Sequence, residues 1–127
     1  MRHFILMSHG YLAKGMASSV EMILGARKDI SYICAYVEGN TCVKHEVLRQ
    51  MESFREGTET VILTDIFGGS VNNELLSLMD KRDVYLVSGM NLALVVELLI
   101  RAEDTADTGS IIAECIQGAR ENMKFCN

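Results

Sequence analysis

Short apolar runs alternate along this chain with segments in which apolar residues recur every three or four positions. Apolar runs of this kind, without polar alternation, are typical of parallel strands that are covered on both faces. The runs occupy residues 3–7, 31–37, 60–64 and 83–88. The intervening segments show helical spacing, as in Leu12, Met16 and Val20. The alternation therefore predicts an α/β fold with a mostly parallel sheet of about four strands flanked by helices.

Composition and charge place the chain among folded, globular proteins. Its 127 residues are 49% hydrophobic and 23% charged, and we expect residues 1–127 to form a single domain. The net charge of -5 argues against nucleic acid or an anionic membrane surface as the main partner. No apolar stretch reaches the roughly 18 residues of a membrane span, no signal peptide is visible, and the four cysteines form no CxxC pair. We therefore expect a cytoplasmic protein with reduced thiols.

The connections between strands limit the order in which the strands can lie. Right-handed crossovers and short loops favour the doubly wound order 2-1-3-4 for four strands. The helices after strands 1 and 3 then leave toward opposite faces, which opens a crevice at the carboxyl ends of these two strands. His9 follows the first strand and Asp65 ends the third. The sequence therefore predicts that His9 and Asp65 meet at this crevice, with residues 88–91 on its flank.

The loop after the third strand has the composition of an anion-binding loop. Asp65 is followed by the pair Gly68-Gly69, and Ser70 stands where the N-cap of the next helix is expected. Backbone N–H groups in such a loop, ahead of a helix N-terminus, favour an anion. We predict that the Gly68 and Gly69 amides and the Ser70 hydroxyl hold the oxygens of a phosphoryl group.

A histidine beside a carboxylate is suited to attack on that phosphoryl group. A carboxylate that accepts a hydrogen bond from one ring nitrogen fixes the tautomer and leaves the other nitrogen as the nucleophile. The carboxylate of Asp65 would also stabilise the charge that develops on the ring of His9 as it takes the phosphoryl group. This chemistry requires neither a metal ion nor a cofactor, and we expect none.

Three blocks of the sequence match the pattern of one known family. The first is Ser8-His9-Gly10 after the first strand, and the third, residues 89–93, is similar to Gly-x-Asn-Leu-Pro. The second and most specific block, residues 65–73, is similar to Asp-Leu-Phe-Gly-Gly-Ser-Pro-x-Asn. With these blocks the chain resembles the IIA component of the mannose-type (mannose, fructose and sorbose) phosphoenolpyruvate-dependent sugar phosphotransferase system. The resemblance covers nearly all of residues 3–125 in order and spacing.

The resemblance implies a phosphotransferase that works through a phosphohistidine intermediate in sugar transport. His9 would be phosphorylated by the carrier protein HPr and would pass the phosphoryl group to a histidine of a IIB component. Asp65 is carried over as the partner of His9, and Thr64 and Ser70 as phosphate-site residues. Family members are commonly homodimers with a flavodoxin-like core, peripheral to the membrane components IIC and IID. The sequence does not name the sugar.

Two residues depart from the family pattern. Val71 and Ala93 stand where the family usually has proline. The first departure concerns the phosphate loop, and the second concerns the surface that meets the partner. Neither removes a reacting group, so the assignment stands.

Other functions could use some of the same residues. A regulatory binding module, whose His9 phosphorylation state is read by a partner protein, needs the same histidine and stays open as the alternative. Histidine phosphatases require an Arg-His-Gly motif and a second active-site histidine, whereas here Ser8 stands at the position of that arginine. Small α/β metal chelatases need a further metal-site histidine and leave the Asp65 motif unexplained. The phosphocarrier interpretation accounts for both loops.

Overall fold

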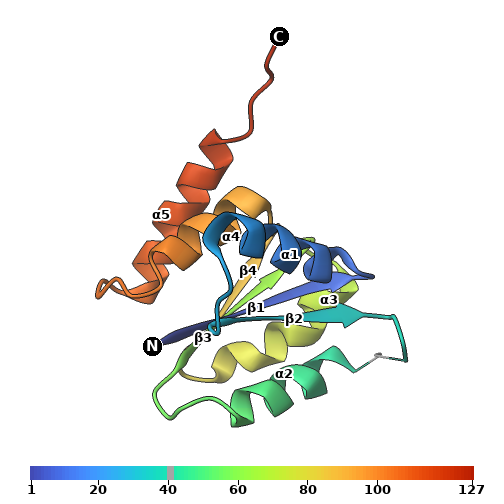
Figure 1. Ribbon diagram of the computed structural model, residues 1–127. Helices are drawn as coiled ribbons and strands as arrows, with labels where there is room; N and C mark the ends of the chain where they lie inside the picture. The colour runs from blue at the N-terminus through green and yellow to red at the C-terminus, as the bar shows by residue number, and fades with distance from the viewer. Residues whose placement is uncertain (40–41) are drawn as a thin grey trace.

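The strands form one parallel sheet with helices on both faces, in a computed structural model that describes residues 1–39 and 42–127 (Figure 1). The strands are Arg2–His9 (β1), Ile30–Ala35 (β2), Glu59–Thr64 (β3) and Val84–Ser88 (β4). The helices are Leu12–Leu24 (α1), Val43–Glu52 (α2), Ser70–Leu75 (α3), Leu92–Ile100 (α4) and Thr108–Glu121 (α5). All strand pairs are parallel and the order is β2-β1-β3-β4, which confirms the predicted doubly wound α/β fold.

The central strand β1 shows why the apolar runs lack polar alternation. Phe4 and Leu6 point to one face of the sheet, Ile5 and Met7 point to the other, and all four are buried. Helices α1, α4 and α5 pack on the first face, whereas α2 and α3 pack on the second (Figure 1). Because both faces are covered, the four consecutive residues in the middle of the strand are all apolar.

The two helices that flank the predicted crevice lie on opposite sides of the sheet. Helix α1 follows β1 on one face, and α3 follows β3 on the other. Strands β1 and β3 are hydrogen-bonded neighbours, with Met7 in register with Thr64. The carboxyl ends of β1 and β3 therefore form the topological switch point, where open α/β sheets bind their ligands.

Several helix and strand ends differ from the predicted ones. Strand β2 ends at Ala35, two residues before the predicted end, because Tyr36 adopts a φ of +64° that a strand cannot continue. The third helix, expected to include Leu78 and Met79, divides into α3 and a 3-10 segment, Leu76–Asp80 (η1). The turn expected at residues 38–40 reaches Asn40, which lies outside the described residues.

Two predicted helix caps are confirmed. Gly25 ends α1 with a φ of +82°, a conformation that favours glycine. Asn91 begins α4, and its side-chain oxygen accepts a hydrogen bond from the N–H of Leu94 at 3.0 Å. Val71 and Ala93 are each the second residue of a helix, α3 and α4. In the first turn an N–H has no helical partner, so this position accepts either proline or another residue.

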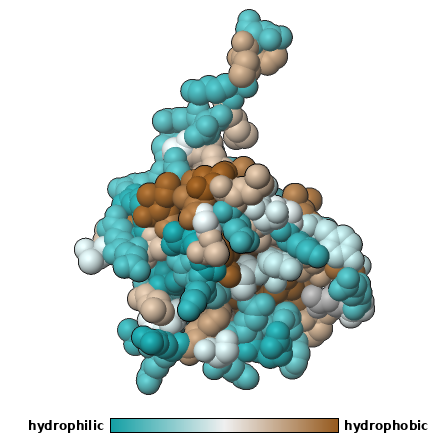
Figure 2. All heavy atoms as spheres, viewed as in Figure 1, coloured by the Kyte–Doolittle hydropathy of each residue, from teal (hydrophilic) through white to brown (hydrophobic). Residues whose placement is uncertain are grey.

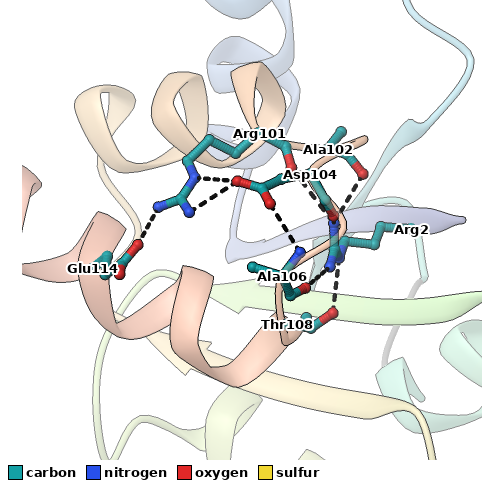
Figure 3. Close-up of polar contacts among 7 residues, drawn as sticks. All are labelled: Arg2, Arg101, Ala102, Asp104, Ala106, Thr108 and Glu114. Atoms are coloured by element: carbon teal, nitrogen blue, oxygen red, sulfur yellow. Dashed lines mark hydrogen bonds and ion pairs between the residues drawn. The ribbon is translucent and has the colours of Figure 1, made fainter.

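The amino end of the sheet is held by Arg2, the first residue of β1 (Figure 3). Its Nε donates to Thr108 Oγ1 at 2.8 Å, and its Nη2 donates to the carbonyl oxygen of Ala106 at 2.8 Å. Its Nη1 donates to the carbonyl oxygens of Ala102 at 3.1 Å and Asp104 at 2.6 Å. Arg2 therefore attaches the loop between α4 and α5 to the sheet, a contact between residues about 100 positions apart in the chain.

Figure 2 shows apolar side chains gathered over α4 on the face of the molecule that carries α1, α4 and α5. Ile100 at the end of α4 is exposed, as are Met22 and Ile23 on α1. Within the described part of the chain, no helix has both the length and the apolar character to span a membrane.

Candidate functional site

His9 and Asp65 meet at the switch point, as the sequence predicts. His9 is the last residue of β1, and Asp65 directly follows β3. The Nδ1 atom of His9 lies 2.9 Å from Oδ2 of Asp65, and the backbone N–H of His9 donates to the same oxygen at 2.9 Å. The Asp65 side chain is only 8% exposed, whereas that of His9 is 38% exposed. The carboxylate is therefore held below the ring, and the ring reaches the surface.

Asp65 is held in its ionised form by the groups around it. Burial raises the pKa of the Asp65 carboxyl, but hydrogen bonds from the backbone N–H and the ring of His9 outweigh that effect. A further hydrogen bond, from the N–H of Ile66 to Oδ1 at 3.0 Å, acts in the same direction. The net result is a pKa below the ordinary value for aspartate.

The ionised carboxylate determines which nitrogen of His9 carries the proton. A carboxylate only accepts hydrogen bonds, so Nδ1 of His9 must donate to it. In the neutral ring Nε2 then keeps its lone pair. Nε2 lies 3.0 Å from the hydroxyl oxygen of Ser70, on the exposed side of the ring. The nitrogen that faces outward is therefore the nucleophilic one.

The glycine pair allows the loop after Asp65 to pass close to the His9 ring. Gly68 has a φ of +76°, a left-handed conformation that favours glycine. A Cβ atom on Gly69 would lie 3.4 Å from Cε1 of His9 and 3.4 Å from the carbonyl oxygen of Ile66. Asn73 closes the loop, since its side-chain nitrogen donates to the Gly68 carbonyl at 3.2 Å.

The prediction that Ser70 caps the helix is wrong. The N-cap of α3 is Gly69, and Ser70 is the first residue of the helix, with no side-chain hydrogen bond to the helix backbone. The hydroxyl of Ser70 instead contacts Nε2 of His9 and accepts a hydrogen bond from the Tyr36 hydroxyl at 2.9 Å. The side chain thus faces the histidine, where the predicted phosphoryl group would bind.

Thr64 lies behind the loop and not beside His9. Its side chain is buried, and its hydroxyl donates to the side-chain oxygen of Asn72 at 2.9 Å. The hydroxyl of Ser88, at the end of β4, donates to the same oxygen at 2.7 Å. Asn72 therefore joins β3, β4 and α3, and Thr64 positions the loop through it. A direct contact between Thr64 and a phosphate stays a prediction.

Tyr36 and Ser8 belong to the site but were not identified from the sequence. Tyr36 was expected inside the second strand, yet its ring centroid lies 5.5 Å from that of His9. Ser8 fixes the turn after β1, because its hydroxyl accepts from the N–H of Ala13 at 2.7 Å and donates to the Gly10 carbonyl at 3.2 Å. The predicted strand order was the available signal for Tyr36, since β2 ends beside β1 at the same edge.

The other histidines lie away from this site. The Nε2 atom of His3 is 3.0 Å from the Ser31 hydroxyl, and its ring stacks on Phe54 at 4.1 Å between centroids. His45 is exposed on α2. Among residues 1–39 and 42–127, no cluster of three or more His, Cys, Asp or Glu side chains is arranged to hold a metal ion.

The family model described as "PTS system fructose IIA component" matches residues 3–116. The chain belongs to this family of the sugar phosphotransferase system (PTS). It is 24% identical over 123 residues to the PTS system mannose-specific EIIAB component of Escherichia coli K12. That alignment covers 94% of this chain but only 38% of the relative, so the chain spans well under half of that protein. The resemblance drawn from the three sequence blocks is thereby confirmed.

Solved structures agree with the family in fold and in sequence. A crystal structure of a proposed PTS permease from Klebsiella pneumoniae has a TM-score of 0.90 and 40% identity, covering 99% of this IIA chain and 91% of the other. The EIIA component from Streptococcus agalactiae has a TM-score of 0.81 and 25% identity, covering 98% and 96% of the two chains. Nearly the whole chain is therefore accounted for by the IIA fold.

Proposed function

We propose that this IIA chain is a phosphocarrier for sugar uptake, which accepts a phosphoryl group from phospho-HPr on His9 and passes it to a IIB component. One observation carries the proposal. Oδ2 of Asp65 accepts a hydrogen bond from Nδ1 of His9 at 2.9 Å, and Nε2 is left on the exposed side of the ring next to Ser70. Family membership supports the same role, since it places the chain in the sugar phosphotransferase system.

The transfer needs only the groups at the switch point. The Nε2 lone pair of His9 attacks phosphorus, and the bond from phosphorus to its donor atom on HPr breaks with its electron pair. Nδ1 keeps its proton, so the ring gains positive charge, which the Asp65 carboxylate stabilises. In the second transfer an acceptor histidine of IIB attacks phosphorus, and the electron pair of the Nε2–P bond returns to His9.

Ser70 and the glycine amides are the groups assigned to the phosphoryl oxygens. The Ser70 hydroxyl lies 3.0 Å from Nε2, within reach of an oxygen on a phosphorus bonded there. The Gly69 N–H makes only a long hydrogen bond, 3.4 Å, to the Ile66 carbonyl, which it could exchange for a phosphoryl oxygen. Hydrogen bonds to charged oxygens are stronger than neutral ones, so the exchange is favourable.

The surface around His9 suits a protein partner better than a small molecule. Ile66 and Phe67, in the loop that passes the ring, are 57% and 83% exposed. Tyr11 and Leu12, at the start of α1, are also more than half exposed. Exposed apolar and aromatic side chains grouped around a reacting atom are typical of protein interfaces. This surface supports HPr and IIB as the partners.

The proposed location and oligomeric state follow from the phosphocarrier role. A phosphocarrier that exchanges with HPr and IIB is cytoplasmic and peripheral to the membrane components IIC and IID. We also propose a homodimer. The apolar patch over α4 in Figure 2 supports this because a dimer would cover such a patch, and Ile100, the last residue of α4, is exposed.

An intact-mass assay tests the proposed function. The protein is mixed with phosphoenolpyruvate, enzyme I and HPr, and the wild type is compared with His9→Gln and with the control His45→Gln. We expect one acid-labile phosphoryl group on the wild type and on His45→Gln, and none on His9→Gln, because a carboxylate orients the ring nitrogen of His9. A phosphoryl group on His9→Gln would overturn the proposal.

A further inference from the structure

Tyr36 adds a second hydroxyl to the group around Nε2 of His9. It is the first residue after β2, and its side chain crosses from the end of β2 to the start of α3. Its hydroxyl donates to the Ser70 hydroxyl oxygen at 2.9 Å, and its ring lies tilted by 41° beside the ring of His9. Tyr36 therefore contacts the group that contacts the nucleophile.

The protons in this cluster can be assigned from one end to the other. Asp65 only accepts, so Nδ1–H of His9 donates to it and Nε2 must accept. Ser70 then uses its single proton for Nε2, and its oxygen is left to accept from Tyr36. The hydrogen bonds run in one direction, from Tyr36 through Ser70 and His9 to Asp65.

The backbone that presents Tyr36 adopts a conformation that residues with a Cβ atom rarely take. Tyr36 has a φ of +64°, and Glu38 two residues later has a φ of +51°. The hydroxyl of Tyr11, beside α1, donates to Glu38 Oε1 at 3.2 Å. Contacts on both sides thus hold the loop, and uncommon backbone conformations held this way are concentrated at functional sites.

We infer that Tyr36 is a positioning residue for phosphoryl transfer at His9 and acts through Ser70. The inference rests on the proposed function. When Nε2 bonds to phosphorus, its lone pair is used, and the Ser70 proton must turn to a phosphoryl oxygen. Tyr36 continues to donate to the Ser70 oxygen, which keeps that oxygen in place and makes its hydroxyl a stronger donor. Tyr36 thereby favours the transfer and the phosphorylated state.

A double-mutant cycle on the phosphorylation rate tests the inference. The variants are Tyr36→Phe, Ser70→Ala and the pair, with Tyr32→Phe as the control because Tyr32 is an exposed tyrosine of β2 outside the site. Tyr36→Phe should slow phosphorylation by HPr about two- to tenfold, the contribution of one hydrogen bond. In the Ser70→Ala background it should have no further effect, and Tyr32→Phe should match the wild type. An equal loss in both backgrounds, or no loss in either, would overturn the inference.

A second measurement needs no phosphoryl donor and therefore separates this inference from the proposed function. In the unphosphorylated protein, the 15N resonance of His9 Nε2 should move in Tyr36→Phe toward that of an imidazole nitrogen without a hydrogen bond. It should move further in Ser70→Ala and no further in the pair. An unchanged resonance in Tyr36→Phe would refute the hydrogen-bond chain. A wild type that takes no phosphoryl group would refute the proposed function instead.

Discussion

Each end of β1 carries a polar side chain that contacts another part of the chain. The two side chains differ in how much of their hydrogen-bonding capacity remains exposed. At the amino end, all three guanidinium nitrogens of Arg2 donate to protein oxygens, and the side chain is 8% exposed. At the carboxyl end, one ring nitrogen of His9 is bonded to Asp65, and the other remains on the exposed side. Every guanidinium nitrogen of Arg2 is thus bonded within the protein, whereas His9 keeps one ring nitrogen on the exposed side of the ring.

Cavity volume alone would place the candidate site at the amino end of the sheet, away from His9. A hollow of about 1030 Å³ lies at the amino end, with Arg2, Glu59 and Thr108 on its wall. These three side chains bond to one another, since Thr108 donates to Glu59 at 2.7 Å and accepts from Arg2 at 2.8 Å. The carboxyl end instead presents Nε2 of His9 on the exposed side of the ring. The candidate site is therefore identified by an accessible, oriented side-chain atom and not by cavity volume.

The largest expected effect comes from the residue that orients His9. Asp65→Asn places an amide where two N–H groups donate to Oδ2, and it removes the negative charge that we expect to stabilise a phosphorylated ring. We expect the phosphorylation rate to fall by at least about 100-fold, because the wrong ring tautomer becomes favoured. Rapid-quench kinetics with phospho-HPr measure this.

Asp107→Asn is the matched control for that variant. Asp107 caps α5 by accepting from the N–H of Ser110 at 3.0 Å, and asparagine caps equally well. Its rate should equal that of the wild type. If Asp65→Asn and Asp107→Asn were equally fast, the role given to Asp65 would be lost.

The next effect is on stability and belongs to the other end of β1. Arg2→Met leaves the carbonyl oxygens of the loop between α4 and α5 without their donor, and a buried unsatisfied group costs about 2 kcal/mol. We expect the free energy of unfolding, from urea titration, to fall by about that amount, while the folded variant is phosphorylated at the wild-type rate.

Arg101→Met serves as the comparison for Arg2→Met. Arg101 forms ion pairs with Asp104 and Glu114 at the surface, and exposed pairs contribute little to stability (Figure 3). The free energy of unfolding should change much less than in Arg2→Met. Equal losses in the two variants would show that Arg2 is not the principal attachment of this loop.

The smallest effect is a pH dependence. Burial raises the pKa of Asp65, but its hydrogen bonds lower it more, so the folded-state pKa lies below that of the unfolded chain. The resulting stability is present above the unfolded pKa of about 4 and is lost as pH falls through the folded value. The melting temperatures of the wild type and Asp65→Asn, measured over a range of pH, should therefore converge below about pH 4. A difference in melting temperature that stays constant as the pH falls would contradict this.

The strand order and the meeting of His9 with Asp65 could be predicted from the sequence, and the side-chain contacts could not. Hydrophobic spacing identifies buried elements, and crossover rules then bring the ends of β1 and β3 together. The position of Tyr36 depends on a single backbone angle, φ +64°, that spacing does not reveal. The same holds for Ser70, whose hydroxyl bonds to His9 and Tyr36 in preference to the helix backbone.

Arg2 shows the same limit at the other end. The predicted strand covered residues 3–7, whereas β1 begins at Arg2. The oxygens that Arg2 binds are mostly backbone carbonyls of a loop about 100 residues away, and any sequence there would supply them. Contacts to backbone groups leave no residue pattern, so only the folded chain reveals them.

The measurement that tests this account most directly is the assignment of the phosphorylated atom by two-dimensional 1H–31P and 1H–15N NMR of the phosphorylated protein. Because Asp65 holds Nδ1 of His9 at 2.9 Å, the account predicts that phosphorus is bonded to Nε2 of His9. Phosphorus on Nδ1, or on any other residue, would contradict the claim that the carboxyl end of β1 presents one oriented nucleophile.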